Sequence, residues 1–389
     1  MKNLQLKNLA AISFLFMLFA VSVSVFAQNG IVTEEGSGLI AEQVMAGDVQ
    51  QGIQMEYKEE YEEDLPETEI VEEGLVGYLS VPKNSENKSG YLFEDLYMNR
   101  QISLTVNNSQ KNFYKKNIIT YYVVDEIYEE MEVVNNIDTK YLKDKEKTVI
   151  TFDLNGVYEY EIKETEDAYL IRFFDLHSIY DKIIVVDAGH GGGDNGCGSR
   201  DSVCYEKMVT LAVVKELKEK LDNTDIKVYY TRLEDKTVYL RPRVRLANDV
   251  GADMFVSIHC NYYDRYWLYD VDGSETLYSS VRKSVAKDSK KLAQIMLDNL
   301  AETTTLSKRS VIDRGVSLYI LKKSKVPATI VEMGYMSDRE DLKYLLNEKK
   351  RKKIVNGLYN GIIAAYKKMY GKTVEEIKEE KLKETENME

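Results

Sequence analysis

The chain has 389 residues but only three cysteines, only three histidines and no excess of basic side chains. So few cysteines exclude a miniature domain that is held together by disulfides. The formal net charge is −13, which excludes the basic footprint that nucleic-acid binding requires, so we expect no nucleic-acid partner. Any histidine chemistry must rest on His177, His190 and His259.

The N-terminus carries Lys2 and Lys7 ahead of an apolar stretch from Leu9 to Phe26 that closes with Val25-Phe26-Ala27. This pattern predicts an export signal over residues 1–27. Its removal takes away two lysines and no acids and leaves a net charge of −15. The alternative is a retained anchor helix, because the apolar stretch is long for a signal and close to the minimum for a membrane span. Both interpretations place the protein outside the cytoplasmic membrane, extracellular or associated with the cell wall, with membrane contact only through an uncleaved N-terminal segment.

The length favours two folded units plus tails. Residues 28–74 are acidic and lack apolar periodicity, and like charges at that density repel one another, which predicts a disordered linker. Residues 75–180 contain β-rich, aromatic runs separated by turn-like clusters, which predict a small antiparallel β-domain. This region carries His177, no cysteine and no glycine-rich loop, so the sequence gives it no chemistry of its own.

Strands and helices alternate over residues 181–370, which predicts an α/β domain with a mostly parallel sheet flanked by helices. Residues 371–389 form a charged tail that we expect to be frayed or disordered. The strands predicted for the α/β domain are Ile183–Asp187, Lys227–Arg232, Ala252–Ile258, Ser317–Leu321 and Ala328–Val331. The predicted helices are Glu206–Leu221, Pro242–Gly251 and Ser284–Leu300, with further C-terminal helices between the last strand and Tyr366.

His190 and His259 each follow an apolar run that is typical of a buried parallel strand. The carboxyl ends of such strands meet at the edge where ligands bind in α/β sheets. Glu206 begins the helix after the His190 loop, so its carboxylate is expected at the same edge, near the positive end of the helix dipole. Two imidazoles and a carboxylate, with one position left for water, form a typical catalytic zinc site. Gly191-Gly192-Gly193 and Gly196 would let the backbone turn closely around the metal.

Glu332 follows the Ala328–Val331 strand, and a carboxylate at the end of a buried strand is costly unless it is used. We therefore predict that Glu332 accepts the proton of the reacting water. Taken singly, each feature has a plainer interpretation: a histidine at a strand end is usually a hydrogen-bonding core residue, and a glycine-rich turn is a weak signal. The combination of four such groups at strand or helix ends favours the zinc site.

Seven stretches in fixed order give the chain a resemblance to a known family: DAGHGGGDNG, YEKMVTLA, YYTR, LRPRVRLAND, ADMFVSIHCN, GSETLY and PATIVEMGYMS. Over about residues 182–366 the chain resembles the zinc-dependent N-acetylmuramoyl-L-alanine amidases of the type 3 amidase family. The resemblance implies zinc ligands at His190, Glu206 and His259 and a catalytic glutamate at Glu332. It also implies hydrolysis of the amide between N-acetylmuramic acid and the L-alanine of the peptidoglycan stem peptide. Many members carry an N-terminal β-domain that targets the wall, which residues 75–180 resemble in size, position and strand content.

The remaining site residues carry more than one interpretation. Asn261 lies two residues after His259, so in a strand it points to the same side, and the family pattern makes it a candidate substrate contact. Cys260 points to the opposite side and should not bind the metal. Cys197 and Cys204 are expected to be a loop disulfide or two inert thiols rather than a thiolate ligand. Arg243 and Asn248 match positions of the family pattern, but the simpler interpretation is an arginine on the surface of its helix and an asparagine that caps it.

The sequence therefore predicts an exported zinc hydrolase of peptidoglycan that acts as a monomer. One rival is a zinc peptidase that cuts within the stem peptide, and another is a wall-binding protein without catalytic activity. All three ligand types and Glu332 are present, which argues against the second rival.

Overall fold

The structure is a computed structural model that describes residues 55–59, 74–84, 90–107, 110–117, 119–123, 133–264 and 271–374. These residues belong to one compact unit, residues 52–389. The predicted signal peptide, most of the predicted linker and the tail after residue 374 lie outside the described residues. Among the helices of the described residues, none has the length and apolar character needed to cross a membrane.

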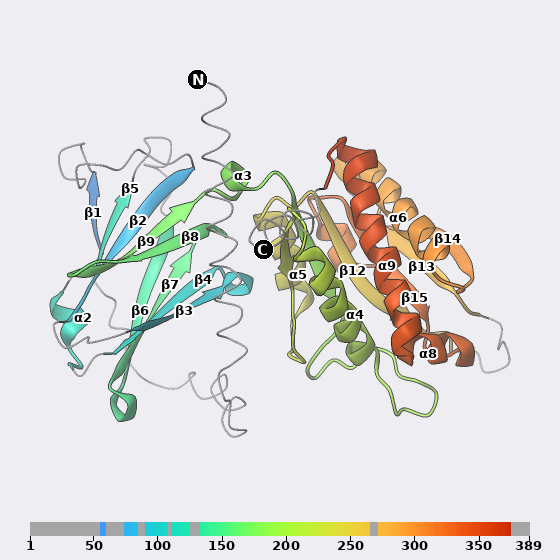
Figure 1. The fold of residues 1–389 in the computed structure, drawn as a ribbon, viewed down its shortest axis with the longest axis horizontal. Helices are drawn as coiled ribbons and strands as arrows, with labels where there is room; N and C mark the ends of the chain where they lie inside the picture. Colours follow the sequence, from blue (N-terminus) through green and yellow to red (C-terminus); the bar gives the residue numbers. More distant parts are fainter. Residues whose placement is uncertain are drawn as a thin grey trace, which may run out of the picture. The chain divides into compact units, whose positions relative to one another are not determined.

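The β-rich region contains two sheets (Figure 1). The first has the order β1-β5-β2-β9-β8, with β1 (Met55–Glu59), β2 (Leu75–Pro82), β5 (Ile119–Val123), β8 (Glu159–Glu164) and β9 (Ala168–Phe174). The second has the order β3-β4-β7-β6, with β3 (Tyr91–Leu96), β4 (Gln101–Asn107), β6 (Val134–Leu142) and β7 (Lys147–Leu154). Two short helices, α2 (Phe113–Lys116) and α3 (Leu176–Ile179), accompany them. Alternate residues of both sheets, such as Leu79, Leu104, Phe152 and Phe173, fill one apolar core, as expected for strands with one buried face.

Every strand pair in these two sheets is antiparallel except β1 with β5, which is parallel. Strand β1 lies inside the segment that we predicted to be a disordered linker, so that prediction is wrong for residues 55–59. We predicted disorder because the segment cannot bury an apolar core of its own. An edge strand needs no such core, because the neighbouring strand β5 supplies its backbone partners.

The α/β domain is built on a six-stranded sheet in the order β11-β10-β12-β15-β13-β14. Its strands are β10 (Ile183–Ala188), β11 (Lys227–Tyr230), β12 (Met254–Asn261), β13 (Ser274–Tyr278), β14 (Lys308–Asp313) and β15 (Ala328–Tyr335). Neighbouring strands run parallel except for β13 with β15, which is antiparallel. The predicted fold class, a helix-flanked α/β domain preceded by a β-rich region, is confirmed.

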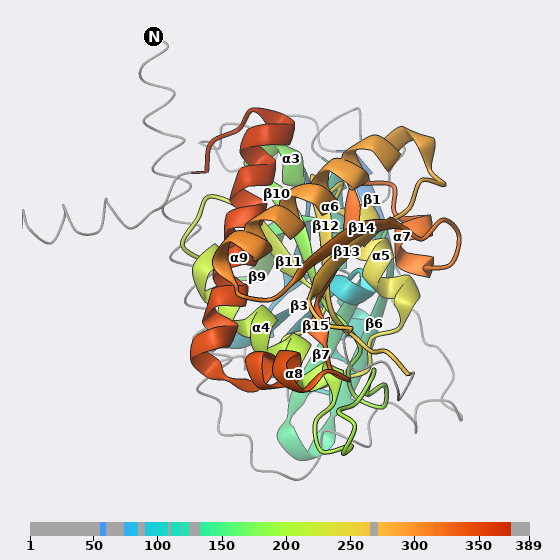
Figure 2. The ribbon, with the colours of Figure 1, turned by 90° about the vertical axis from the view of Figure 1, so that its right-hand side faces the viewer.

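Helices cover both faces of this sheet (Figures 1 and 2). They are α4 (Glu206–Leu221), α5 (Leu240–Asp249), α6 (Lys283–Thr303), α7 (Tyr319–Lys323), α8 (Arg339–Leu346) and α9 (Glu348–Ala365), the last continued by a π-helical turn at Tyr366–Tyr370. Helices α4, α6 and α9 share one core with Ile184 and Val186 of β10, whereas α5 and α7 share the other with Ile183 and Val185. Alternate residues of β10 therefore serve opposite faces, which explains why the strand is apolar almost throughout.

Several predicted boundaries need correction. Helix α4 has the predicted bounds, but β11 ends at Tyr230, before the predicted Arg232, and α5 begins at Leu240, ahead of Pro242. The strand predicted at Ser317–Leu321 is wrong, because this segment enters the short helix α7, in which the consecutive residues Ile320 and Leu321 are both buried. A short apolar run does not distinguish a helix from a strand by its pattern alone. Strands β13 and β14 were not predicted.

His259 and Glu332 lie within their strands rather than at the ends, because β12 and β15 continue to Asn261 and Tyr335. The two residues are opposite each other in the parallel register of these strands. The register shifts between His259 and Asn261, and pairing then resumes with Asn261 opposite Tyr335. The predicted strand-end position of Glu332 is therefore wrong, although the sheet still places it beside His259.

Candidate metal centre

Three side chains converge near the carboxyl ends of the inner strands β10 and β12. His190 follows β10, Glu206 is the first residue of α4, and His259 lies on β12. One ligand atom from each residue lies within 4.8 Å of the others. The structure thus brings together the three residues that the sequence singled out as zinc ligands.

The Glu206 carboxylate is the centre of this group. Its Oε2 lies 3.1 Å from His190 Nε2 and its Oε1 lies 2.9 Å from His259 Nδ1. Two backbone N–H groups also donate to it, Cys197 N to Oε2 at 3.0 Å and Cys260 N to Oε1 at 2.9 Å. Burial opposes ionisation of this carboxyl, but the hydrogen bonds to both histidines outweigh burial and hold its pKa well below the usual range. Glu206 is therefore ionised at neutral pH.

The two imidazoles respond to the same carboxylate. Burial by itself lowers the pKa of each histidine, but the hydrogen bonds to Glu206 raise the pKa of His190 above its usual value and that of His259 to about 9. A carboxylate of Asp194 also lies 2.8 Å from His190 Nδ1, where it orients the ring. Binding of a cation by this group would release the protons that the imidazoles hold.

Two glycines permit this close arrangement. A Cβ on Gly189 would lie 2.4 Å from His259 Cε1, and a Cβ on Gly196 would lie 2.5 Å from Glu206 Oε2. Gly196 also has a φ of +65°, a backbone conformation that side chains disfavour. The cluster can therefore form only with glycine at these positions. The residues present fit a zinc ion in their donor types, their spacing and their charge.

Glu332 extends the group toward the neighbouring strands. Its Oε2 is buried and has no hydrogen-bond partner among the described residues. Burial raises the pKa of Glu332 to about 7, although His259 nearby lowers it. Glu275 on β13 faces it in the antiparallel register of β13 and β15. A carboxyl of this kind is poised to exchange a proton near neutral pH.

The structure also places Asn261 and the three cysteines. Asn261 Nδ2 donates to Glu275 Oε1 at 2.7 Å, so its amide is oriented by a residue beside Glu332. Cys260 is buried in the core that it shares with α4. Cys197 and Cys204 are free thiols, so the loop disulfide is not formed, and burial raises the pKa of both.

Two polar residues of α5 differ from their predicted roles. Arg243 is only 2% exposed and pairs with the fully buried Asp187 at 2.6 Å, so the prediction of a surface arginine is wrong. Asn248 does not cap its helix: its Oδ1 accepts a hydrogen bond from Lys325 N at 2.7 Å. Sequence reasoning also passed over Asp187, although a carboxylate inside an apolar strand signals a buried partner.

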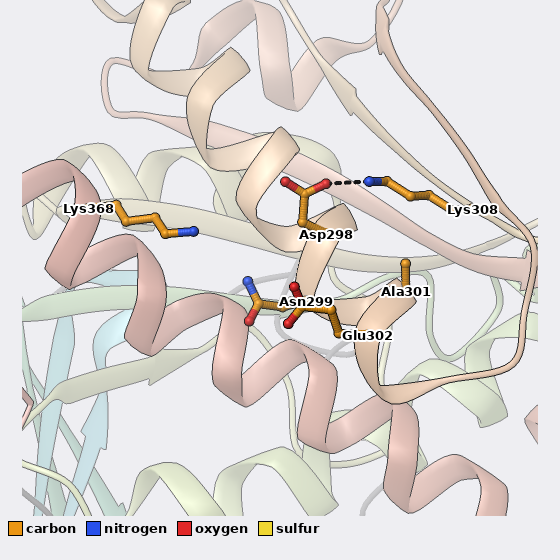
Figure 3. A pocket seen from close by; sticks show the side chains of 6 residues that line it. All are labelled: Asp298, Asn299, Ala301, Glu302, Lys308 and Lys368. Atoms are coloured by element: carbon orange, nitrogen blue, oxygen red, sulfur yellow. Dashed lines mark ion pairs between the residues drawn. The ribbon is translucent and has the colours of Figure 1, made fainter.

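The described residues also form a cavity of about 370 Å³ elsewhere, along α6 and β14 (Figure 3). Its lining includes Asp298 and Lys308, which form an ion pair at 2.6 Å, and Lys368 (Figure 3). None of the three clustered ligand residues, nor Glu332, lines it. The convergence of catalytic group types, rather than this cavity, therefore identifies the candidate site.

Comparison with known proteins places this site in a family. Residues 184–364 match the family model described as N-acetylmuramoyl-L-alanine amidase. The uncharacterized protein YqiI of Bacillus subtilis is 30% identical over 188 residues, which cover 48% of this chain and 85% of that protein. The probable N-acetylmuramoyl-L-alanine amidase AmiB of Haemophilus influenzae is 28% identical over 223 residues, which cover 46% of this chain and 51% of that protein.

Among solved structures, the N-acetylmuramoyl-L-alanine amidase AmiC2 of Nostoc punctiforme is 30% identical, with a TM-score of 0.43. The match covers 48% of this chain and 98% of that one. The matched part of this chain is the α/β domain with its His190, Glu206 and His259 cluster. The chain belongs to the type 3 family of N-acetylmuramoyl-L-alanine amidases.

Proposed function

We propose that this protein is a peptidoglycan hydrolase that cleaves the amide between N-acetylmuramic acid and the L-alanine of the stem peptide. The observation that carries the proposal is the grouping of His190, Glu206 and His259 within 4.8 Å, inside the segment that matches the amidase family. Relatives with this activity in their names, such as AmiB of Haemophilus influenzae, support the choice of bond.

The three clustered side chains would hold one zinc ion. Zinc bound by three protein ligands supplies Lewis acidity at its remaining position. The chain's own contribution is to keep Glu206 ionised and to orient His190 through Asp194. The ionised carboxylate is the form of Glu206 that binds a metal, and Asp194 fixes the ring of His190, which would give up its proton when the metal binds.

Glu332 would move the protons. Its buried Oε2 has no partner in the part of the chain that the structure describes, so it can accept a proton from the attacking water and then deliver that proton to the departing amide nitrogen. An amide nitrogen is a poor leaving group until it is protonated, so one carboxyl that both accepts and donates suits this reaction. A pKa of about 7 makes both forms of Glu332 accessible at neutral pH. Asn261, held by Glu275, is proposed to contact the substrate.

Residues 75–180 are proposed to bind the wall, and residues 1–27 to direct export, so that the enzyme meets its substrate outside the cytoplasmic membrane as a monomer. The β-rich region also contacts the catalytic part directly. Arg100 donates from Nε and Nη2 to the two carboxylate oxygens of Asp249 at 2.7 and 2.6 Å, and Tyr97 Oη donates to Tyr230 O at 2.7 Å. These contacts support a β-rich region that is packed against the catalytic part.

Product analysis separates this proposal from its rivals. Hydrolysis of the proposed bond frees the amino group of L-alanine and leaves glycan strands without peptides. A zinc peptidase that cuts within the stem would free other amino groups and leave L-alanine attached to muramic acid. A wall-binding protein without activity would release neither. Digestion of purified peptidoglycan, followed by identification of the new amino termini, is the test.

A further inference from the structure

The backbone at the end of β10 is held in an unusual way. His190 has a φ of +61°, a left-handed conformation that non-glycine residues rarely adopt. Such a conformation persists only when surrounding contacts enforce it. Three carbonyl oxygens at the bend therefore need defined partners, those of Ala188, Gly189 and His190.

Two buried arginines supply those partners. Arg243 donates from Nη1 to Ala188 O and from Nη2 to His190 O, both at 2.7 Å. Arg232 donates from Nε to Ala188 O at 2.9 Å and from Nη2 to Gly189 O at 2.8 Å. Three successive carbonyl groups at the bend are thus held by two guanidinium groups.

The same network reaches the elements that carry the other two ligands. Arg232 Nη2 also donates to Lys207 O at 2.9 Å, in the first turn of α4, next to Glu206. The fully buried Asp187 accepts hydrogen bonds from Arg243 at 2.6 Å and, through its other oxygen, from Ser257 Oγ. Ser257 lies on β12, two residues before His259. The network therefore connects β10, α4 and β12.

The chemistry favours a positioning role over an electrostatic one. Arg232 and Arg243 are 1% and 2% exposed. Among the described residues, the hydrogen bonds of Arg232 go to carbonyl and hydroxyl oxygens, and the only carboxylate bound by Arg243 is that of Asp187. Buried positive charge repels a cation, so these groups do not attract the metal. A guanidinium instead holds several N–H donors in one rigid plane and can bind several carbonyl oxygens at once.

We propose that Arg232 and Arg243, joined to β12 through Asp187 and Ser257, are positioning residues that fix the three ligand-bearing segments and thereby set the affinity for the metal. This inference rests on the proposed zinc site. A lysine at either position keeps the charge but has a single nitrogen, so it cannot bridge the same oxygens.

The test compares Arg232→Lys and Arg243→Lys with the control Arg245→Lys in the full chain. Arg245 is on the same helix as Arg243 and donates to Met98 O, away from the candidate site, so its variant also loses an arginine–carbonyl bond. The readouts are the Kd for zinc, from competition with a chromophoric chelator, and the unfolding midpoint of the zinc-free protein. Because outer partners of metal ligands typically contribute about 10- to 100-fold in affinity, we expect a rise in Kd of that size for both test variants.

Ser257→Ala is the milder second variant, because it removes a single hydroxyl donor and should fold even if the lysine variants do not. Loss of the single hydrogen bond from Ser257 to the Asp187 carboxylate should raise the Kd by about three- to tenfold. A purely structural role predicts a lower unfolding midpoint with an unchanged Kd in Arg243→Lys and Ser257→Ala, and that result would overturn the inference. A wild-type protein that binds zinc but cleaves no peptidoglycan would contradict the proposed function alone, while the Kd series would still decide the positioning role.

Discussion

Replacement of Glu332 by glutamine isolates the proton-transfer step from metal binding. The glutamine side chain has nearly the same shape but cannot accept the proton of the reacting water. Glu332 is not among the three clustered ligand residues, and within the described residues its Oε2 has no hydrogen-bond partner to lose. We therefore expect Glu332→Gln to fold and to retain its zinc.

The expected loss of activity follows from the role of the residue. General acid–base groups typically contribute about a hundredfold to ten-thousandfold in rate, which corresponds to about 3–5 kcal/mol of activation free energy. Burial raises the pKa of Glu332 to about 7, close to neutral pH, where such a group is most effective. The loss should therefore lie in the upper part of that range.

The assay measures release of L-alanine amino groups from purified peptidoglycan, together with zinc content and the unfolding midpoint. Glu275→Gln is the matched control, because Glu275 lies opposite Glu332 on the adjacent strand, is 7% exposed, and becomes a glutamine that keeps an oxygen to accept the hydrogen bond from Asn261. This variant removes a buried negative charge from the same neighbourhood but leaves the proton acceptor in place, so it should lose less than about tenfold. A Glu332→Gln variant that cleaves at nearly the wild-type rate, or one that loses its zinc, would refute the assigned role.

Three further predictions concern the metal, the β-rich region and a buried acid. His190→Ala and His259→Ala should each lose stoichiometric zinc in metal analysis, and retention of one zinc per chain would exclude them as ligands. Deletion of residues 28–180 should weaken attachment to intact wall more than it slows hydrolysis of a soluble fragment; equal losses would mean that this region supports the catalytic fold instead. Burial raises the pKa of Asp341 above its usual value of 3.8, against the hydrogen bonds from Tyr335 N and Gly273 N. The folded chain thus keeps a proton that the unfolded chain releases, so the free energy of unfolding falls as the pH rises above 3.8. Urea denaturation of Asp341→Asn, which does not titrate, should show a smaller fall, and identical slopes for both proteins would contradict this.

The sequence predicted those features of the fold that depend on local pattern. The bounds of α4 follow from helical spacing of Leu211, Val214 and Leu217, and β10 follows from a continuous apolar run. Strands β13 and β14 were missed because they are short and include polar or charged residues, which only their neighbours in the sheet can accommodate. Strand β1 was missed for a related reason, since its pairing partner lies more than fifty residues away.

The ligand types were visible in the sequence, whereas the groups that hold them in place were not. Arg243 lies on a helix that carries several other charged or polar residues, so the sequence pattern of the helix suggests that its side chain is exposed to solvent. It is buried because Asp187 and Ala188 of β10, and His190 in the loop after it, offer oxygens from a segment more than fifty residues away. The placement of Glu332 opposite His259 likewise depends on the register of two strands, which a single strand's sequence does not specify.

The most direct test of the proposed activity is digestion of purified peptidoglycan by the zinc-loaded protein, by the same protein after treatment with a chelator, and after zinc is restored. We expect the zinc-loaded protein to free L-alanine amino groups and to leave peptide-free glycan strands, the chelator to abolish this, and added zinc to recover it. Cleavage that persists without metal, or fragments in which L-alanine remains attached to muramic acid, would contradict the assignment of this protein as a zinc amidase.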